Sequence, residues 1–301
     1  MIKIEEVSML YMEYVKNRHK KQWFNVFRYN FSKNIISYFN GFDIENLTLK
    51  DLESWKEFVI SQNFSNSYNL QLYSMLEGFL EFCSKKYNFC YDFLPDFLPF
   101  NKKIEYKKTD FYTLKEFKKF IKGFDNQLYK TFFEFMFYTG CRPGEAMAIK
   151  VRDIDDNFVT INKTIDEHGK RELGTPKTYS SNRTIYISNS LKKSLNNLIK
   201  SYGCMELDYF VFGGSKPLAP TTINRYKLNA CKKVGIRPIT LHQFRHSHAT
   251  LLLNNDIDIH VISNRLGHSR VSTTLDVYTH SNFNQEKRLI KSLNSAKFNL
   301  F

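Results

Sequence analysis

A polar, lysine-rich segment at residues 101–110, NKKIEYKKTD, divides this chain of 301 residues into two parts of different character. Residues 1–110 contain 15 Lys and Arg against 14 Asp and Glu, whereas residues 111–301 contain 29 against 16. The net charge of +14 therefore falls almost wholly on the second part. We expect two domains, 1–100 and 111–301, joined by a basic linker, with a polyanionic partner for the second.

The first part has the pattern of a helical module. Four stretches place apolar residues at helical spacing, namely MLYMEYVKN, FNVFRYNFSKNIISYF, DLESWKEFVIS and YNLQLYSMLEGFLEFCSKKY. Gly41 separates the second stretch from the third, and Pro95 and Pro99 predict the end of the fourth helix. We therefore expect four helices and no strand in this part.

The second part combines helical and strand patterns. Thr113 and Glu116 have the spacing of a capping box, and the stretch YKTFFEFMFYT that follows is apolar nearly all round, which predicts a buried helix. FVTINKT and RTIYIS alternate with period two and predict a small antiparallel sheet, with Lys177 on a turn at its edge. Helical patterns resume at SLKKSLNNLIKSY and again from residue 220. The predicted fold class is mainly α with a small antiparallel β-sheet in the second domain.

Cysteine usage and hydropathy indicate an intracellular protein. The five cysteines show neither a CxxC pair nor a metal-binding spacing, which favours free thiols in a reducing compartment; they are Cys83, Cys90, Cys141, Cys204 and Cys231. The acidic start MIKIEEVSML is unlike a signal peptide, and no run of 18 apolar residues exists to span a membrane. We expect a cytoplasmic location and no membrane partner.

The segment LHQFRHSHATLLL is the richest in candidate site residues. If it is helical, His242 and Arg245 are neighbours on one face and can meet one ligand. His242 and His246 also have the i, i+4 spacing of zinc ligands, and His248 follows closely. No Glu stands between the pair as in HExxH and no third ligand follows at short range, so we expect no metal.

Two further segments place single polar groups at turns. Arg142 follows Gly140 and precedes Pro143, at the start of a short helix whose N-terminus adds positive potential, and Glu145 lies one turn on. In DIHVISNRLGHSRVSTTLDVYTH, a helix is expected to end at a Gly, with a His just past the turn and a second short helix after it. Two short helices around a Gly turn also fit a helix-turn-helix, so this segment alone leaves a transcription factor open.

Together these groups follow one order along the chain, and that order resembles a known family. The segments TGCRPGEAMAIKVRDID, TPKTYSSNRTIYIS, ITLHQFRHSHATLLL and LGHSRVSTTLDVYTH are similar to the signature segments of the tyrosine recombinases, the phage-integrase family. The resemblance is close over residues 111–280, where all six catalytic positions are present and Phe244 stands where the family usually has leucine. Residues 1–99 are similar only as a helical module of the right size and place.

The resemblance implies a role for each site residue. Arg142 and Arg245 would bind the non-bridging oxygens of the scissile phosphate, and Tyr278 would attack the phosphorus to form a 3′-phosphotyrosine. Lys177 would give a proton to the leaving 5′-oxygen.

The other three residues have assisting roles. His242 would assist proton transfer at the tyrosine, His268 would hydrogen-bond the phosphoryl group, and Glu145 would support the site from behind. Fixed cations supply positioning and charge, so no metal, cofactor or ATP is expected.

The implied protein is a site-specific DNA recombinase of a phage or an integrative element that acts as a tetramer on double-stranded recombination sites. Residues 1–100 would be a helical core-type DNA-binding domain and residues 111–301 an α+β catalytic domain whose tail NQEKRLIKSLNSAKFNLF docks onto a neighbouring subunit. DNA-bending or excision proteins are possible accessory partners. A host chromosome-dimer resolvase, a type IB topoisomerase and a non-catalytic helix-turn-helix regulator remain alternatives.

Overall fold

The computed structural model describes residues 2–92, 94–100, 110–165, 173–174, 182–203 and 206–268. The contacts between Cα atoms divide the chain into two compact units, Met1–Tyr106 and Lys107–Phe301. Each unit has its own hydrophobic core.

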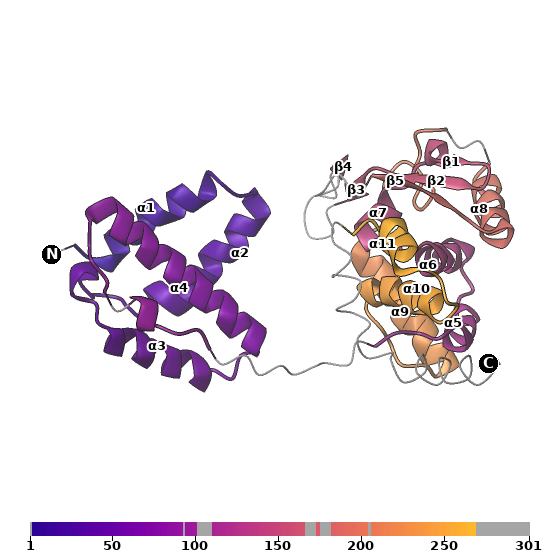
Figure 1. Cartoon of the computed structure of the whole chain (residues 1–301). Helices are drawn as coiled ribbons and strands as arrows, with labels where there is room; N and C mark the ends of the chain where they lie inside the picture. Colours follow the sequence, from indigo (N-terminus) through magenta and orange to yellow (C-terminus); the bar gives the residue numbers. More distant parts are fainter. Residues whose placement is uncertain are drawn as a thin grey trace, which may run out of the picture. The chain divides into compact units, whose positions relative to one another are not determined.

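The first unit is a bundle of helices (Figure 1). Its elements are α1 (Ile4–Lys16), α2 (Lys21–Phe31) running on into a π-helical turn (Ser32–Ile36), α3 (Leu49–Ser61) and α4 (Asn66–Tyr87), with short 3-10 turns at Ile44–Asn46 and Leu94–Asp96. The expected four helices are confirmed.

Trp55 of α3 is fully buried at the centre of this bundle. Its indole Nε1 donates to the carbonyl oxygen of Asn34 in the π-helical turn at 2.8 Å, so the buried indole N–H is satisfied. Burial of a ring of this size contributes about 2 to 3 kcal/mol.

The prediction that prolines end the fourth helix is wrong. α4 ends at Tyr87, because Asn88 adopts the left-handed conformation with φ +56° that closes helices without a glycine. Pro95 lies further along, at the 3-10 turn Leu94–Asp96.

The second unit surrounds the long apolar helix α6 (Gln127–Thr139). Its other helices are α5 (Leu114–Ile121), α7 (Pro143–Ala148), α8 (Asn189–Ser201), α9 (Pro220–Val234), α10 (Leu241–Leu253) and α11 (Ile259–Leu266). α6 contacts α10 and α8 (Figure 1) and has Phe132, Phe133 and Phe137 fully buried, as its sequence predicts.

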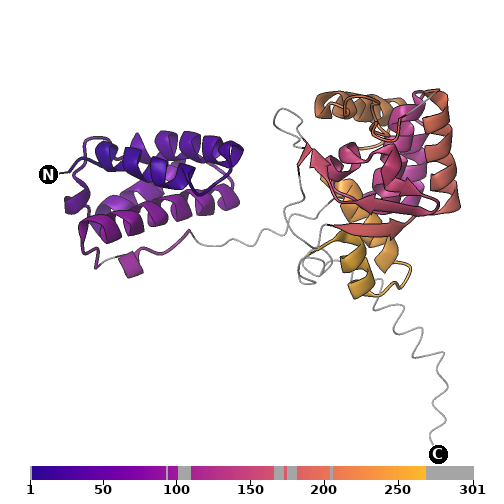
Figure 2. The ribbon, with the colours of Figure 1, turned by 90° about the horizontal axis from the view of Figure 1, so that it is seen from above.

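A small antiparallel sheet lies beside these helices (Figure 2). Its strand order is β1 (Ile154–Asp155), β2 (Phe158–Ile161) and β5 (Arg183–Tyr186), and β3 (Thr164–Ile165) pairs separately with β4 (Leu173–Gly174). Val159 of β2 pairs with Ile185 of β5, and both are buried, so the period-two alternation correctly identified the apolar face. The short strand β1 was not predicted.

Candidate anion site of the second unit

The left-handed turn at Gly140 brings Arg142 to the start of α7. Gly140 closes α6 with φ +68°, and Arg142 is the residue that precedes the first turn of α7. Glu145, three residues on, accepts from the backbone N–H of Arg142 at 2.8 Å and from its guanidinium Nη1 at 2.9 Å. The carboxylate thus caps the helix and holds the Arg142 side chain.

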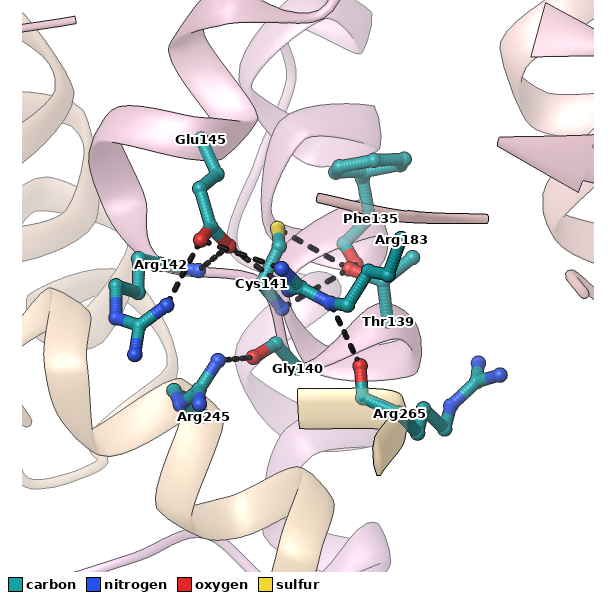
Figure 3. A network of polar contacts seen from close by, with 9 residues as sticks. All are labelled: Phe135, Thr139, Gly140, Cys141, Arg142, Glu145, Arg183, Arg245 and Arg265. Atoms are coloured by element: carbon teal, nitrogen blue, oxygen red, sulfur yellow. Dashed lines mark hydrogen bonds and ion pairs between the residues drawn. The ribbon is translucent and has the colours of Figure 1, made fainter. Parts of the chain in front are cut away.

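Arg245 comes to the same place from α10 (Figure 3). It is only 2% exposed, and its Nη1 donates to the carbonyl oxygen of Gly140 at 3.0 Å. Its Nη2 is buried and has no hydrogen-bond partner among the described residues. Burial and the nearby Arg142 lower the pKa of Arg245 to about 9, so the group is still protonated at neutral pH.

His242 and His268 face these arginines as neutral imidazoles. Burial lowers the pKa of His242, and the charges of Arg245 and Arg142 lower it further. His268 follows the left-handed Gly267 that ends α11, and burial together with Arg245 and Arg142 lowers its pKa to about 4. At neutral pH both rings are therefore uncharged, and each has one N–H donor and one nitrogen acceptor.

The other two histidines of α10, His246 and His248, have different neighbours. The rings of His242 and His246 lie 5.2 Å apart, whereas Nε2 of the buried His248 accepts from Nε of Arg265 at 3.1 Å. In the part of the chain that the structure describes, no three His, Cys, Asp or Glu side chains are grouped so that they could hold a metal ion.

Two further arginines, neither of them predicted from the sequence, lie among these residues. Arg183, the first residue of β5, donates from Nη2 to Oε2 of Glu145 at 2.8 Å, and Arg265 donates from Nη1 to the carbonyl of Tyr186 at 3.0 Å. Their sequence positions gave no signal, since an arginine at a strand start or in the last turn of a helix is commonly exposed.

The structure thus brings together four of the six predicted catalytic residues and Glu145. The remaining two, Lys177 and Tyr278, lie outside the described residues. The residues drawn in Figure 3 include four arginines and a single carboxylate, so positive charge dominates. A site of this composition suits an oxyanion such as a phosphate.

The amino-acid sequence of this chain is similar to known proteins of one family. The model of the phage integrase family matches residues 111–285. The ICEBs1 integrase of Bacillus subtilis (strain 168) is 30% identical over 300 residues, which cover 91% of this chain and 78% of that protein. The integrase of Staphylococcus phage L54a is 30% identical over 171 residues, which cover 52% of this chain and 48% of that protein.

Two solved structures share the fold. A lambda integrase dimer bound to a COC′ core site superimposes with a TM-score of 0.70 at 16% identity, covering 90% of this chain and 97% of that chain. The Tn1549 transposon integrase in complex with circular intermediate DNA gives 0.73 at 18% identity, covering 95% and 99%.

The protein is an enzyme of the tyrosine recombinase class, which breaks and rejoins DNA strands. It belongs to the phage integrase family. None of its described helices combines the length and apolar character needed to cross a membrane.

Proposed function

We propose that this recombinase is the integrase of a phage or an integrative element, and that Tyr278 is its nucleophile. The hydroxyl oxygen of Tyr278 would form a bond to the scissile phosphorus while the bond to the 5′-oxygen breaks, leaving a 3′-phosphotyrosine. A 5′-hydroxyl from another duplex would then reverse the step and complete strand exchange. The likeness to the ICEBs1 integrase and to the integrase of Staphylococcus phage L54a supports this assignment.

The single observation that carries the proposal is the buried Nη2 of Arg245. A buried guanidinium N–H without a partner is costly, and a ligand oxygen would satisfy it. Nη1 of the same guanidinium is already held by Gly140, so its plane is fixed before any ligand arrives. Arg142, oriented by Glu145, would bind a second oxygen of the same phosphate.

His242 and Lys177 would carry out the proton transfers of the cleavage reaction. His242, neutral at pH 7, would take the proton from the Tyr278 hydroxyl, and His268 would hydrogen-bond the phosphoryl group. Lys177 would deliver the proton that the leaving 5′-oxygen needs. The reaction would use no metal, and bond energy stored in the phosphotyrosine would make ATP unnecessary.

The DNA-bound assembly would be a homotetramer on two paired duplexes in the bacterial cytoplasm, associated there with the nucleoid. Residues 1–100 would contact the core site, residues 101–110 would link the domains, and residues 111–301 would carry out catalysis. The tail after residue 284 would dock onto a neighbouring subunit, and DNA-bending or excision factors would assist. One lambda integrase structure is of a tetramer bound to a Holliday junction, which supports the assembly state.

Covalent capture on a nicked duplex tests this proposal. The duplex carries the end sequence of the element that encodes the chain, with a nick placed so that the cleaved fragment diffuses away. The wild-type protein should form an adduct that survives a denaturing gel, and Tyr278→Phe should form none. A wild-type protein that binds this duplex but forms no adduct would favour a non-catalytic regulator.

A host resolvase is the second candidate. A XerC-like tyrosine recombinase of Caldanaerobacter subterraneus is 28% identical over 205 residues and supports it. Adduct formation on a chromosomal dimer-resolution site, with none on the element end, would select this alternative.

A further inference from the structure

The side chain of Arg183 is almost entirely buried. It bonds to the carboxylate of Glu145, which also bonds to Arg142. Its side chain is 7% exposed, and it approaches Glu145 with two nitrogens, Nη2 at 2.8 Å from Oε2 and Nη1 at 3.3 Å from Oε1. Oε1 also accepts from Nη1 of Arg142 at 2.9 Å (Figure 3). Glu145 is therefore shared between two guanidiniums, one on each side.

The third nitrogen of Arg183 reaches a different element. Its Nε donates to the carbonyl oxygen of Arg265 at 2.8 Å, in the last turn of α11. The last carbonyls of a helix lack partners within the helix, so this bond stabilises the end of α11. His268 lies three residues further on, just past the Gly267 turn.

Arg265 makes the reciprocal connection. Its Nη1 donates to the carbonyl of Tyr186, the last residue of β5, at 3.0 Å, and its Nη2 to the carbonyl of Tyr138 at 3.1 Å. Its Nε donates to Nε2 of His248 at 3.1 Å. The two arginines thus connect β5 and α11 in both directions; Arg183 bonds to two acceptor groups and Arg265 to three.

We propose that Arg183 is a positioning residue for DNA cleavage, which orients Arg142 through Glu145 and places His268 through the end of α11. The inference rests on the proposed function of Arg142 and His268. A guanidinium suits this task because its planar fork can meet a carboxylate and a carbonyl at once, which an ammonium cannot do with the same geometry.

Removal of Arg183 has a consequence that depends on pH. Burial raises the pKa of Glu145, but the hydrogen bonds and charges of Arg183 and Arg142 bring it below its usual value. Arg183 contributes the largest of these lowering effects, so without it the pKa of Glu145 should rise. The protonated carboxyl would hold Arg142 less well, so the acid limb of the cleavage rate should move to higher pH.

The experiment compares Arg183→Met, Arg183→Lys and the wild type in single-turnover cleavage of the nicked duplex, over a range of pH. Arg183→Met should cleave about 10- to 100-fold more slowly, because Arg142 is no longer held in place. Its affinity for the duplex should change less than about 3-fold, since many phosphate contacts remain. Arg183→Lys should restore part of the rate and most of the wild-type pH profile.

Arg237→Met is the matched control. Arg237 also bonds a carboxylate, Glu116, and a backbone carbonyl, that of Phe111 at 2.7 Å, but it lies outside the anion site. This variant should keep the wild-type pH profile even if its stability falls. All rates are referred to the folded fraction measured by circular dichroism.

The outcomes separate this inference from the proposed function. A wild-type protein that forms no adduct contradicts the proposed function. A wild-type adduct together with an Arg183→Met pH profile equal to that of the wild type overturns only the role of Arg183. If Arg183→Met does not fold, the cleavage rate of Arg183→Lys decides: it should stay below that of the wild type, and a rate equal to the wild type would overturn the role of Arg183.

Discussion

Nη1 of Arg245 and the carbonyl oxygen of Gly140 are joined by a hydrogen bond of 3.0 Å between α10 and the end of α6. The bond depends on the backbone of Gly140, which has φ +68°. A Cβ atom at this position would lie 2.5 Å from Cδ2 of His248 and 2.7 Å from a methyl of Leu266. The carbonyl that holds the candidate phosphate-binding arginine is therefore available only where residue 140 has no side chain.

Gly140→Ala should destabilise the protein more than Gly235→Ala. Both glycines close helices with positive φ, but nothing lies within 4 Å of a Cβ built at Gly235. The backbone cost of about 1 kcal/mol is common to both, and overpacking should add about 1 to 3 kcal/mol at Gly140. Urea denaturation of the two variants measures the difference, and equal losses would contradict the close packing at Gly140.

Arg245→Lys should abolish most cleavage while DNA binding persists. A lysine can donate to the Gly140 carbonyl or to a phosphate oxygen, but it lacks the fixed fork that meets both. We expect single-turnover cleavage to fall at least about 100-fold, close to 3 kcal/mol of transition-state stabilisation. Arg152→Lys is the control, because Arg152 is exposed and paired with Asp208. Near-normal cleavage by Arg245→Lys would show that one donor is enough.

Acid should destabilise the fold through His248. Burial and the charge of Arg265 lower the pKa of this histidine to about 3, whereas in the unfolded chain it is about 6.5. The unfolded state therefore binds a proton more readily, and the free energy of unfolding falls as pH drops from about 6.5 toward 3. Between pH 7 and pH 5, protonation of His248 in the unfolded state should lower the free energy of unfolding by about 2 kcal/mol.

His248→Gln isolates this contribution, because its amide oxygen can accept from Arg265 but does not titrate. Urea denaturation at both pH values should show a smaller acid loss for this variant than for the wild type. Equal losses would mean that His248 does not become protonated upon unfolding.

Removal of residues 285–301 should separate cleavage from assembly. From its sequence, we expect the tail to present the apolar residues Leu289, Ile290, Leu293 and Phe298 to another subunit. Adduct formation on a single nicked site should remain near the wild-type level, whereas tetrameric synapsis of two sites, followed by native gel electrophoresis, should be impaired. Normal synapsis by the truncated protein would indicate that the tail packs on its own domain.

Local sequence signals predicted most of the fold. Thr113 and Glu116 form the expected capping box, and the alternating stretches form β2 and β5, because both signals depend on nearby residues. The fourth stretch ends at Tyr87, as α4 does, but the predicted cause was wrong: Asn88 in the left-handed conformation ends the helix before the prolines are reached. The arrangement of Arg142, His242, Arg245 and His268 was expected only because of the family resemblance.

The partners of Arg183 and Arg265 could not be predicted from local pattern. Arg183 meets Glu145 across 38 residues and the Arg265 carbonyl across 82. Such contacts follow from how β5, α7 and α11 pack, and a single sequence contains no periodic trace of them.

The ring of Phe244, the neighbour of Arg245, is buried among other aromatic rings at centroid distances of 5.1 to 6.5 Å, those of Tyr112, Phe117, Phe120 and Phe133. A leucine here would leave space that these rigid neighbours fill poorly, and α10 could settle at a different depth. A chimera with α10 from a relative that has leucine at this position would therefore also need that relative's residues that pack against the leucine. α10 and the rings around Phe244 therefore form one packing unit, which can be exchanged only as a whole.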